Sequence, residues 1–121
     1  MATIQKTVSP VDGRVYVERP LATLGEIDAA LTTARKAFTG WRATMLAERS
    51  AILQRFCDEF EKRGAKIAEE LTWQMGRPAR YAPSEVRGTL ERARHMISIA
   101  PRALENVDAG PKEDFTRFVR R

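Results

Sequence analysis

The sequence contains very little of the two side chains that most often carry chemistry, cysteine and histidine. Among 121 residues there is one cysteine, Cys57, and one histidine, His95. A single cysteine excludes a disulfide within the chain, and it also excludes metal sites built from several cysteines. Disulfide scaffolds and cysteine-rich metal modules are therefore ruled out.

Long apolar runs are also missing. No stretch approaches the roughly 18 consecutive apolar residues of a membrane span, and residues 1–6 lack the apolar core and cleavage site of a secretory signal. Hydrophobic residues make up 43% of the chain and charged residues 31%, which is typical of soluble globular proteins. We therefore expect one small soluble domain, a cytoplasmic location and no membrane partner.

Glycine-rich phosphate-binding motifs do not occur either. The chain contains neither G-x-G-x-x-G nor G-x-x-x-x-G-K-[ST], so no residue is predicted to bind a nucleotide cofactor.

The charge balance leaves one binding function open. Twenty-one basic residues against 16 acidic residues give a formal charge of +5, which raises the hypothesis of a basic nucleic-acid binder. Most basic residues alternate with acidic ones, and the exceptions are residues 77–80 and 117–121. We interpret the charges as solvated faces and predict no nucleic-acid partner. A steep salt dependence of DNA or RNA binding would reveal one.

The first 22 residues predict a β-hairpin over about 4–22. Asp12-Gly13 is a strong turn signal, because glycine takes the positive φ that a tight hairpin turn requires. Val15 and Val17 alternate with polar neighbours as in a half-buried strand. Pro20 cannot donate a ladder hydrogen bond, so the strand should end there or lie at an edge.

A first helix is predicted over about 24–40. Thr23-Leu24-Gly25-Glu26 fits a capping box, in which the hydroxyl and the carboxylate satisfy free N–H groups at the helix start. Gly40 suits a helix stop. An apolar stripe at helical spacing follows the cap; it consists of Ile27, Ala30, Leu31, Ala34, Ala37, Phe38 and Trp41.

Two further helical stretches are predicted, over about 46–75 and 84–104. Gly64 either breaks the first of them or kinks it, and Gly76-Arg77-Pro78 ends it. Pro101 should kink or end the second. The predicted buried faces consist of Leu53, Phe56, Cys57, Phe60, Ile67, Ala68 and Leu71, and of Val86, Leu90, Ala93, Ile97, Ala100 and Leu104.

The end of the sequence predicts a turn at residues 108–111 and a strand that begins at about 115–121. The pattern stops while the strand is still developing.

None of the side chains considered for chemistry predicts an active site. Cys57 lies on an apolar helix face, which indicates a buried core thiol rather than a nucleophile. His95 lies opposite the apolar stripe of its helix and is expected in solvent. Glu59, Glu61, Glu69 and Glu70 suit solvated ion pairs with neighbouring basic residues, and Trp41 and Trp73 suit packing. We therefore assign no catalytic, cofactor-binding or metal-binding residue.

The order of these signals nevertheless resembles the opening segment of NAD(P)-dependent aldehyde dehydrogenases. Residues 9–13 resemble the family's "NP-x-[TD]-G" opening, with Ser9 where asparagine is more usual. Residues 34–41 resemble its "A-x-x-A-F-x-x-W" helix, and residues 47–53 its "x-x-R-x-x-x-L" helix start. Residues 69–78 resemble a helix ending of the form "E-x-G-K-P", with Gln74 and Arg77 as variants. The motifs occur in order and cover nearly the whole chain.

This resemblance implies an α/β fold in the parent enzyme. Residues 1–121 would form the N-terminal part of its cofactor-binding domain, a segment that is mostly α-helical with an N-terminal β-hairpin and a truncated C-terminal strand. The parent would oxidise aldehydes to carboxylic acids with NAD or NADP, whereas the segment alone would be structural, inactive and without a cofactor. Its implied partners are the remainder of the dehydrogenase chain and further copies in a homo-oligomer. A free-standing helical interaction module is the alternative.

Overall fold

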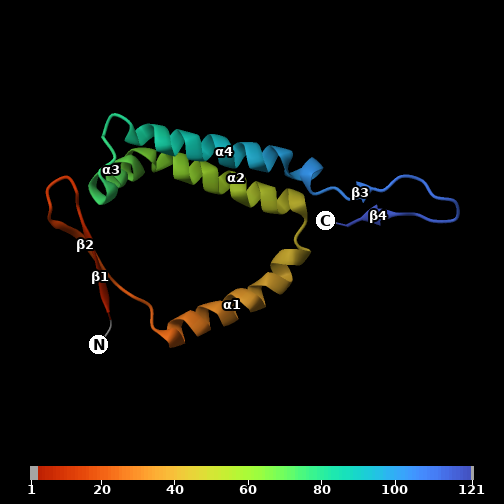
Figure 1. The fold of residues 1–121 in the computed structure, drawn as a ribbon, viewed down its shortest axis with the longest axis horizontal. Coiled ribbons are helices and arrows are strands. Elements are labelled where there is room, and N and C mark those ends of the chain that lie inside the picture. The colour runs from red at the N-terminus through yellow and green to blue at the C-terminus, as the bar shows by residue number, and fades with distance from the viewer. Residues whose placement is uncertain (1–2, 121) are drawn as a thin grey trace.

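The computed structural model describes residues 3–120, whose helices and strands are labelled in Figure 1. The chain begins with strands β1 (Ile4–Val8) and β2 (Val15–Pro20) and helix α1 (Leu24–Ala43). Helices α2 (Leu46–Lys62), α3 (Gly64–Met75) and α4 (Ala82–Ala103) follow, and strands β3 (Val107–Asp108) and β4 (Phe118–Val119) come last. The expected order of a β-hairpin followed by helices is confirmed. Within residues 3–120 no helix has both the length and the apolar character needed to cross a membrane.

Strands β1 and β2 form the expected antiparallel hairpin. Gly13 has a φ of 74°, and its N–H donates to the carbonyl of Ser9 at 2.8 Å. The pairing is regular up to Thr7, which lies opposite Val17, but the next pair is Val8 with Val15. Tyr16 is therefore the extra residue of a β-bulge, which re-aims a side chain and breaks the alternation of a strand.

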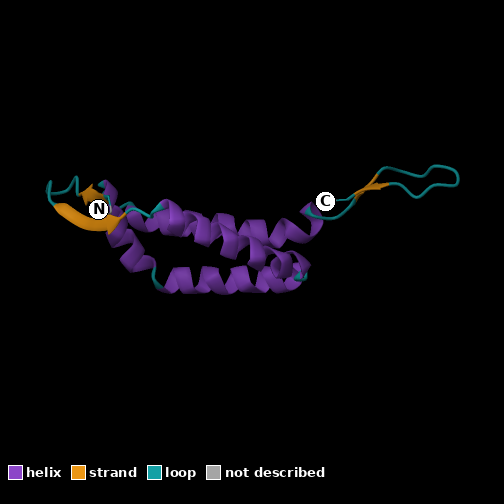
Figure 2. Ribbon diagram, turned by 90° about the horizontal axis from the view of Figure 1, so that it is seen from below, coloured by secondary structure: helices purple, strands orange, loops and turns teal. Residues whose placement is uncertain are grey.

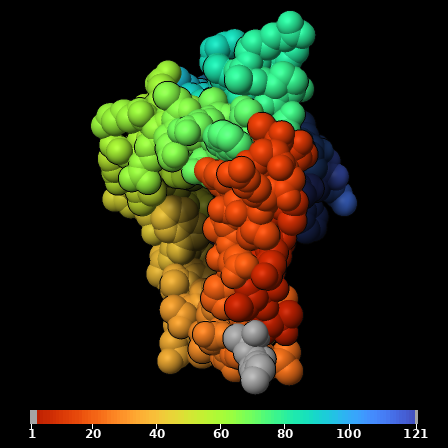
Figure 3. All heavy atoms as spheres, turned by 90° about the vertical axis from the view of Figure 1, so that its left-hand side faces the viewer, coloured from red at the N-terminus to blue at the C-terminus, as the bar shows by residue number. Residues whose placement is uncertain are grey.

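This bulge corrects the predicted face of β2. Val15 is exposed, whereas Val17 and Tyr16 are half-buried. The Tyr16 ring stacks on Trp73 of α3, with ring centroids 6.1 Å apart and an interplanar angle of 3°. The hairpin thus packs on a helix through an aromatic ring, as a two-stranded sheet needs some external surface for stability. Figure 3 shows the hairpin as an arm that reaches down from the green residues of the helices.

Helix α1 begins with the predicted capping box. The backbone N–H of Glu26 donates to the Thr23 hydroxyl at 3.3 Å, and the backbone N–H of Thr23 donates to the Glu26 carboxylate at 2.7 Å. The predicted stop at Gly40 is wrong, because the helix continues to Ala43. Gly40 keeps a negative φ, since good helix formers follow it and no proline forces an end.

The stretch predicted over 46–75 is two helices, so Gly64 marks a break rather than a kink. Helix α2 ends at Lys62, and Arg63, with φ −91° and ψ 3°, separates it from α3. A Cβ at Gly64 would lie 3.3 Å from Cγ1 of Val86 on α4. The glycine therefore allows α3 and α4 to approach closely at the break. At the other end of α3, Gly76 has a φ of 73° and stops the helix as predicted.

Helices α2, α3 and α4 together form the core, which we call the helical bundle. Its buried apolar residues are Cys57, Ala68, Ala82, Val86 and Leu90, and Phe60, Ile67, Leu71, Ala93 and Ile97 pack around them. Helix α4 begins two residues earlier than predicted, at Ala82, and it continues past Pro101 to Ala103. Of the two alternatives predicted for Pro101, a kink or an end of the helix, the end is excluded, and the helix stops within one residue of the predicted residue 104.

The C-terminal part is a second hairpin rather than a lone strand. Asp108 pairs with Phe118 and Val107 with Val119, so β3 was missed by the sequence pattern. Of the predicted strand, residues 118–119 form β4, and Phe115 makes an isolated bridge with Lys112. Arg121, the last residue of that prediction, lies outside the described residues. The turn predicted at residues 108–111 is displaced, because Asp108 lies in β3 and the chain reverses at residues 113–114, between the bridged residues Lys112 and Phe115. Gly110 has a φ of 80° and donates its N–H to the Asp108 carboxylate at 2.8 Å. Figures 1 and 2 show the two hairpins at opposite ends of the helical part.

Candidate functional site

The single thiol lies inside the helical bundle, as predicted. Cys57 is only 1% exposed and packs in the cluster that contains Val86 and Leu90. A thiol nucleophile needs access to substrate and a cation, histidine or helix N-terminus that lowers its pKa. Cys57 is enclosed by apolar side chains and is closed to substrate in this arrangement, so it is a packing residue of the bundle.

The one histidine and the carboxylates also lie where solvent reaches them. His95 is exposed on α4. Glu59 pairs with Lys62 at 2.6 Å on α2, and Glu69 pairs with Lys66 at 3.1 Å on α3. Each pair lies within its own helix, as expected. Exposed pairs of this kind contribute little to stability, typically about 0–1 kcal/mol.

Glu61 departs from this pattern, because its partner lies on another helix. Its carboxylate is 2.7 Å from the Arg94 guanidinium on α4, and Asp58 is 3.4 Å from the same group. The hydrogen bond from Arg94 lowers the pKa of Glu61 below its ordinary value. The three charges tie α2 to α4 at the surface, which is a structural arrangement rather than an acid–base pair.

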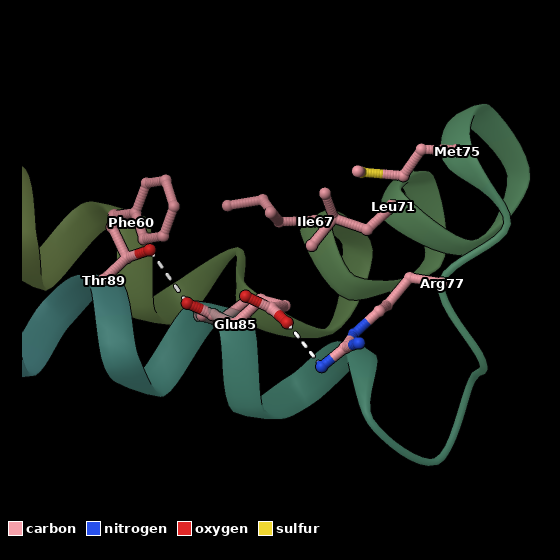
Figure 4. A pocket seen from close by; sticks show the side chains of 8 residues that line it. Phe60, Ile67, Leu71, Met75, Arg77, Glu85 and Thr89 are labelled. Atoms are coloured by element: carbon pink, nitrogen blue, oxygen red, sulfur yellow. Dashed lines mark hydrogen bonds and ion pairs between the residues drawn. The ribbon is translucent and has the colours of Figure 1, made fainter.

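A first hollow, the α3–α4 pocket, has a volume of about 420 Å³. Figure 4 shows Phe60, Ile67, Leu71 and Met75 along one side of it. Arg77 and Glu85 form an ion pair of 2.6 Å at one end. The pocket offers apolar surface, one charged pair and the hydroxyl of Thr89, which donates to the carbonyl of Glu85 at 2.8 Å.

A second hollow lies between α2 and α4 and reaches the C-terminal end of α1, where Trp41 forms part of its lining. This α2–α4 groove has a volume of about 440 Å³, and its apolar lining includes Trp41, Leu46, Leu53, Phe56, Met96 and Leu104. Leu53 and Phe56 were predicted to be buried, yet they are 47% and 59% exposed. Their helix has the expected apolar face, but nothing within residues 3–120 covers this part of it.

One cation lies among these apolar side chains. Arg49 lines the α2–α4 groove, and its Nε is buried without a hydrogen-bond partner among the described residues. Sequence reasoning missed this position as a candidate contact, although Arg49 is the arginine of the "x-x-R-x-x-x-L" pattern at residues 47–53.

Helix α1 presents a second uncovered apolar surface. The α1 stripe, defined as Ile27, Ala30, Leu31, Ala34, Ala37, Phe38 and Trp41, was predicted from periodicity, but α1 has no buried residue. Leu31 is 52% exposed and Phe38 58%. Figure 1 shows α1 meeting the start of α2 at its C-terminal end and lying away from the helical bundle toward its N-terminal end.

The hairpin contacts α3 at three points, which we call the hairpin–α3 contact. Beyond the Tyr16–Trp73 stack, partial burial and a hydrogen bond to Glu70 raise the pKa of the Tyr16 hydroxyl above its ordinary value. Pro10 packs on the helix end so closely that a Cβ at Gly76 would lie 2.8 Å from Pro10 Cγ. Sequence reasoning missed this contact, because a β-bulge has no simple sequence pattern.

The described residues do not form a metal or nucleotide site. Within residues 3–120 no group of three or more His, Cys, Asp or Glu side chains could hold a metal ion. A dinucleotide pyrophosphate needs a glycine-rich turn before a helix N-terminus. Gly64, the one glycine that begins a helix here, is packed against Val86 instead. The residues present therefore do not fit a bound NAD.

These features define a class of protein segment: a helical layer with two uncovered apolar surfaces, supported by a hairpin. The particular family follows from the comparisons. The model of the aldehyde dehydrogenase family matches residues 2–121, and the chain belongs to that family.

Known relatives are much longer than this chain. A vanillin dehydrogenase from Corynebacterium glutamicum is 35% identical over 83 residues, which are 69% of this chain and 17% of that protein. An aldehyde dehydrogenase from Deinococcus radiodurans is 36% identical over 72 residues, 60% of this chain and 14% of that protein. The chain thus spans about a sixth of these relatives.

Solved structures agree with this relation. An NAD-dependent benzaldehyde dehydrogenase from Corynebacterium glutamicum has a TM-score of 0.81 at 27% identity, covering 93% of this chain and 24% of that chain. PnpE, solved in complex with nicotinamide adenine dinucleotide, has a TM-score of 0.85 at 25% identity, covering 96% of this chain and 24% of that chain. The fold described above therefore recurs inside larger dehydrogenases.

Proposed function

We propose that this chain is the N-terminal structural segment of an aldehyde dehydrogenase and belongs to its cofactor-binding domain. The parent enzyme oxidises an aldehyde to a carboxylic acid with NAD or NADP, and the segment supports that enzyme without catalysing a step. The observation that carries the proposal is the pair of uncovered apolar surfaces, the α1 stripe and the α2–α4 groove. A segment of this kind requires the remainder of a larger protein.

The total accessible surface supports this interpretation. The chain exposes 10230 Å² at a mass of 13.7 kDa. A folded monomer of this mass exposes about 6,600 Å² by the usual scaling of area with mass. The excess of about 3,600 Å² lies on this chain alone and is larger than the roughly 1,000–2,500 Å² that each partner contributes to an obligate interface. The partner that covers it is proposed to be the rest of the dehydrogenase chain, with further copies completing a homo-oligomer.

The cofactor belongs to the parent enzyme in this proposal. NAD or NADP accepts the hydride from the aldehyde when it is bound, and the relatives named above include an NAD-dependent enzyme. Nothing in the described residues fits its pyrophosphate, so no step is assigned to this segment. The free thiol of Cys57 suits a reducing compartment, and a cytoplasmic location is part of the same proposal.

Internal contacts of the basic residues support a chain without a nucleic-acid partner. Arg77 pairs with Glu85, and the guanidinium of Arg80 lies 4.6 Å from the centroid of the Tyr81 ring. Arg117 donates to the carbonyl of Ala109 at 3.1 Å. Binding to DNA or RNA that weakens steeply with salt would contradict this part of the proposal.

A chimera tests the structural role. This chain replaces the matching segment of the benzaldehyde dehydrogenase from Corynebacterium glutamicum, and NADH formation from benzaldehyde is followed. A folded chimera that forms NADH, next to an isolated chain that forms none, is the expected result. A folded chimera without activity contradicts the structural role, and NADH formation by the isolated chain contradicts the non-catalytic one.

A further inference from the structure

The separation of α1 from the helical bundle requires an explanation. An apolar stripe and an apolar groove on the same chain would ordinarily close on each other to remove their surface from water. The two surfaces share Trp41, at the C-terminal end of α1. The rest of the stripe does not close onto the groove, and α1 has no buried residue.

The same open arrangement recurs in whole dehydrogenases. The match to the benzaldehyde dehydrogenase covers 93% of this chain with a TM-score of 0.81. The part of this chain that lies outside the match, 7%, is shorter than the 20 residues of α1. The match therefore includes at least part of α1. Helix α1 is therefore part of the fold that the two proteins share, and about three quarters of that larger chain lie outside the match as protein material that can cover the two surfaces.

The lining of the α2–α4 groove indicates the chemistry of that material. Most of the lining is apolar, and Arg49 is the one charged residue among the described residues that line it. Its Nε lacks a partner within residues 3–120. Burying a guanidinium further without an acceptor is strongly unfavourable, whereas a carboxylate can accept two parallel hydrogen bonds from it.

We propose that an apolar segment from the remainder of the dehydrogenase chain inserts between the α1 stripe and the α2–α4 groove. This inserted segment carries an aspartate or glutamate whose carboxylate pairs with Arg49. The inference rests on the proposed function. It adds which surfaces of this chain are covered, which kind of segment covers them, and which ion pair fixes the position of that segment.

A photo-crosslinking experiment identifies the occupant. In the chimera described above, p-benzoylphenylalanine replaces Arg49, and the crosslinked residue is located by mass spectrometry. The expected crosslink joins position 49 to the benzaldehyde dehydrogenase part of the same chain, within a few residues of an Asp or Glu. A crosslink to residues 3–120, or to a second copy, overturns the inference.

Charge variants at the same position test the pairing by the sign of their effect. In the chimera, Arg49→Glu is expected to lower the ratio of folded to unfolded protein at least about tenfold, because two carboxylates then face each other. In the isolated chain the same variant is expected to be neutral or mildly stabilising, since position 49 lies in the first turns of α2, where a negative charge suits the helix dipole.

Matched variants complete the design. Arg49→Lys keeps the charge and is expected to lose less than Arg49→Glu in the chimera. Arg55→Glu changes the same charge on an exposed part of α2 and is expected to leave the chimera's unfolding midpoint unchanged. Equal effects of Arg49→Glu and Arg55→Glu in the chimera overturn the inference.

The two proposals fail in different ways. A chimera that forms NADH while its position-49 crosslink falls inside residues 3–120 overturns the inserted segment and leaves the structural role standing. A folded chimera without NADH formation overturns the structural role itself.

Discussion

Helices α1 and α4 are nearly equal in length and both carry an apolar face, yet they differ completely in burial. Helix α4 has 22 residues and buries Ala82, Val86 and Leu90 against α2 and α3. Helix α1 has 20 residues and buries none. Periodicity therefore shows which face of a helix is built for packing, but it does not show whether the packing partner lies within the same chain.

The largest difference between the two helices should appear when a leucine is truncated in each. Leu90 is 5% exposed, and Leu90→Ala is expected to lower the free energy of unfolding by about 3 kcal/mol, because it removes buried methyl groups and leaves a cavity. Leu31→Ala on α1 is the control, with an expected loss below about 0.5 kcal/mol. Urea unfolding followed by circular dichroism measures both. Equal losses would contradict the comparison.

The next largest expected effect on stability comes from replacing two glycines, one in each region. Gly76→Ala is expected to cost about 1–3 kcal/mol, because Gly76 has a φ of 73° and its Cβ would meet Pro10. Gly40 lies within α1 with open space around it, so Gly40→Ala is expected to favour the helix by about 1 kcal/mol. The first change should also weaken the Tyr16–Trp73 stack, measured by tryptophan fluorescence. A neutral Gly76→Ala would show that the hairpin–α3 contact does not constrain this position.

The sequence predicted most of the fold for local reasons. The capping box at Thr23, the turn at Gly13 and the stop at Gly76 depend on neighbouring residues, and each was predicted correctly. The stop at Gly40 failed because glycine alone does not end a helix. Gly76 does so because it takes the left-handed conformation with a φ of 73°, and Pro78 disfavours the helical conformation for Arg77.

The remaining features depend on contacts between distant residues, which a single sequence does not display. The bulge at Tyr16 occurs where that ring stacks on Trp73. The Glu61–Arg94 pair joins α2 to α4. The exposure of Leu53 and Phe56 follows from the absence of a cover within residues 3–120. The predicted apolar faces of α1 and α2 contain the expected residues, but much of their surface is exposed, because nothing within residues 3–120 covers it.

A third comparison concerns the cap of α1. Thr23→Ala removes the acceptor of the Glu26 N–H and is expected to cost about 1 kcal/mol of helix stability. Because α1 has no buried residue, the loss should appear in the carbon chemical shifts of α1 and leave the unfolding midpoint of the helical bundle unchanged. A lowered bundle midpoint would show that α1 and the bundle unfold together.

The smallest expected effect is the pH dependence of stability, which one carboxylate causes at the start of α1 and another causes in the helical bundle. The cap lowers the pKa of Glu26, first through its hydrogen bond from the Thr23 backbone, and Arg94 lowers the pKa of Glu61. A lowered pKa stabilises the folded state above the ordinary value, and this stabilisation is lost as the pH falls through the folded-state value. Acid should therefore weaken the α1 start through Glu26 and the α2–α4 contact through Glu61.

Single variants separate the two contributions. Glu26→Gln should remove part of the pH dependence of α1 chemical shifts only, and Glu61→Gln part of that of the bundle midpoint only. A change in the pH dependence of the bundle midpoint for Glu26→Gln, or of the α1 chemical shifts for Glu61→Gln, would contradict this division between the two carboxylates.

Amide hydrogen exchange on the isolated chain tests the central claim most directly, namely that α1 lacks a packing partner within residues 3–120. The account predicts that amides near Val86 and Leu90 exchange at least about 100-fold more slowly than those in the middle of α1, because protection follows burial and packing. Equal protection of α1 and α4 would show that α1 is packed within this chain, and would contradict the claim that its stripe awaits the rest of a dehydrogenase.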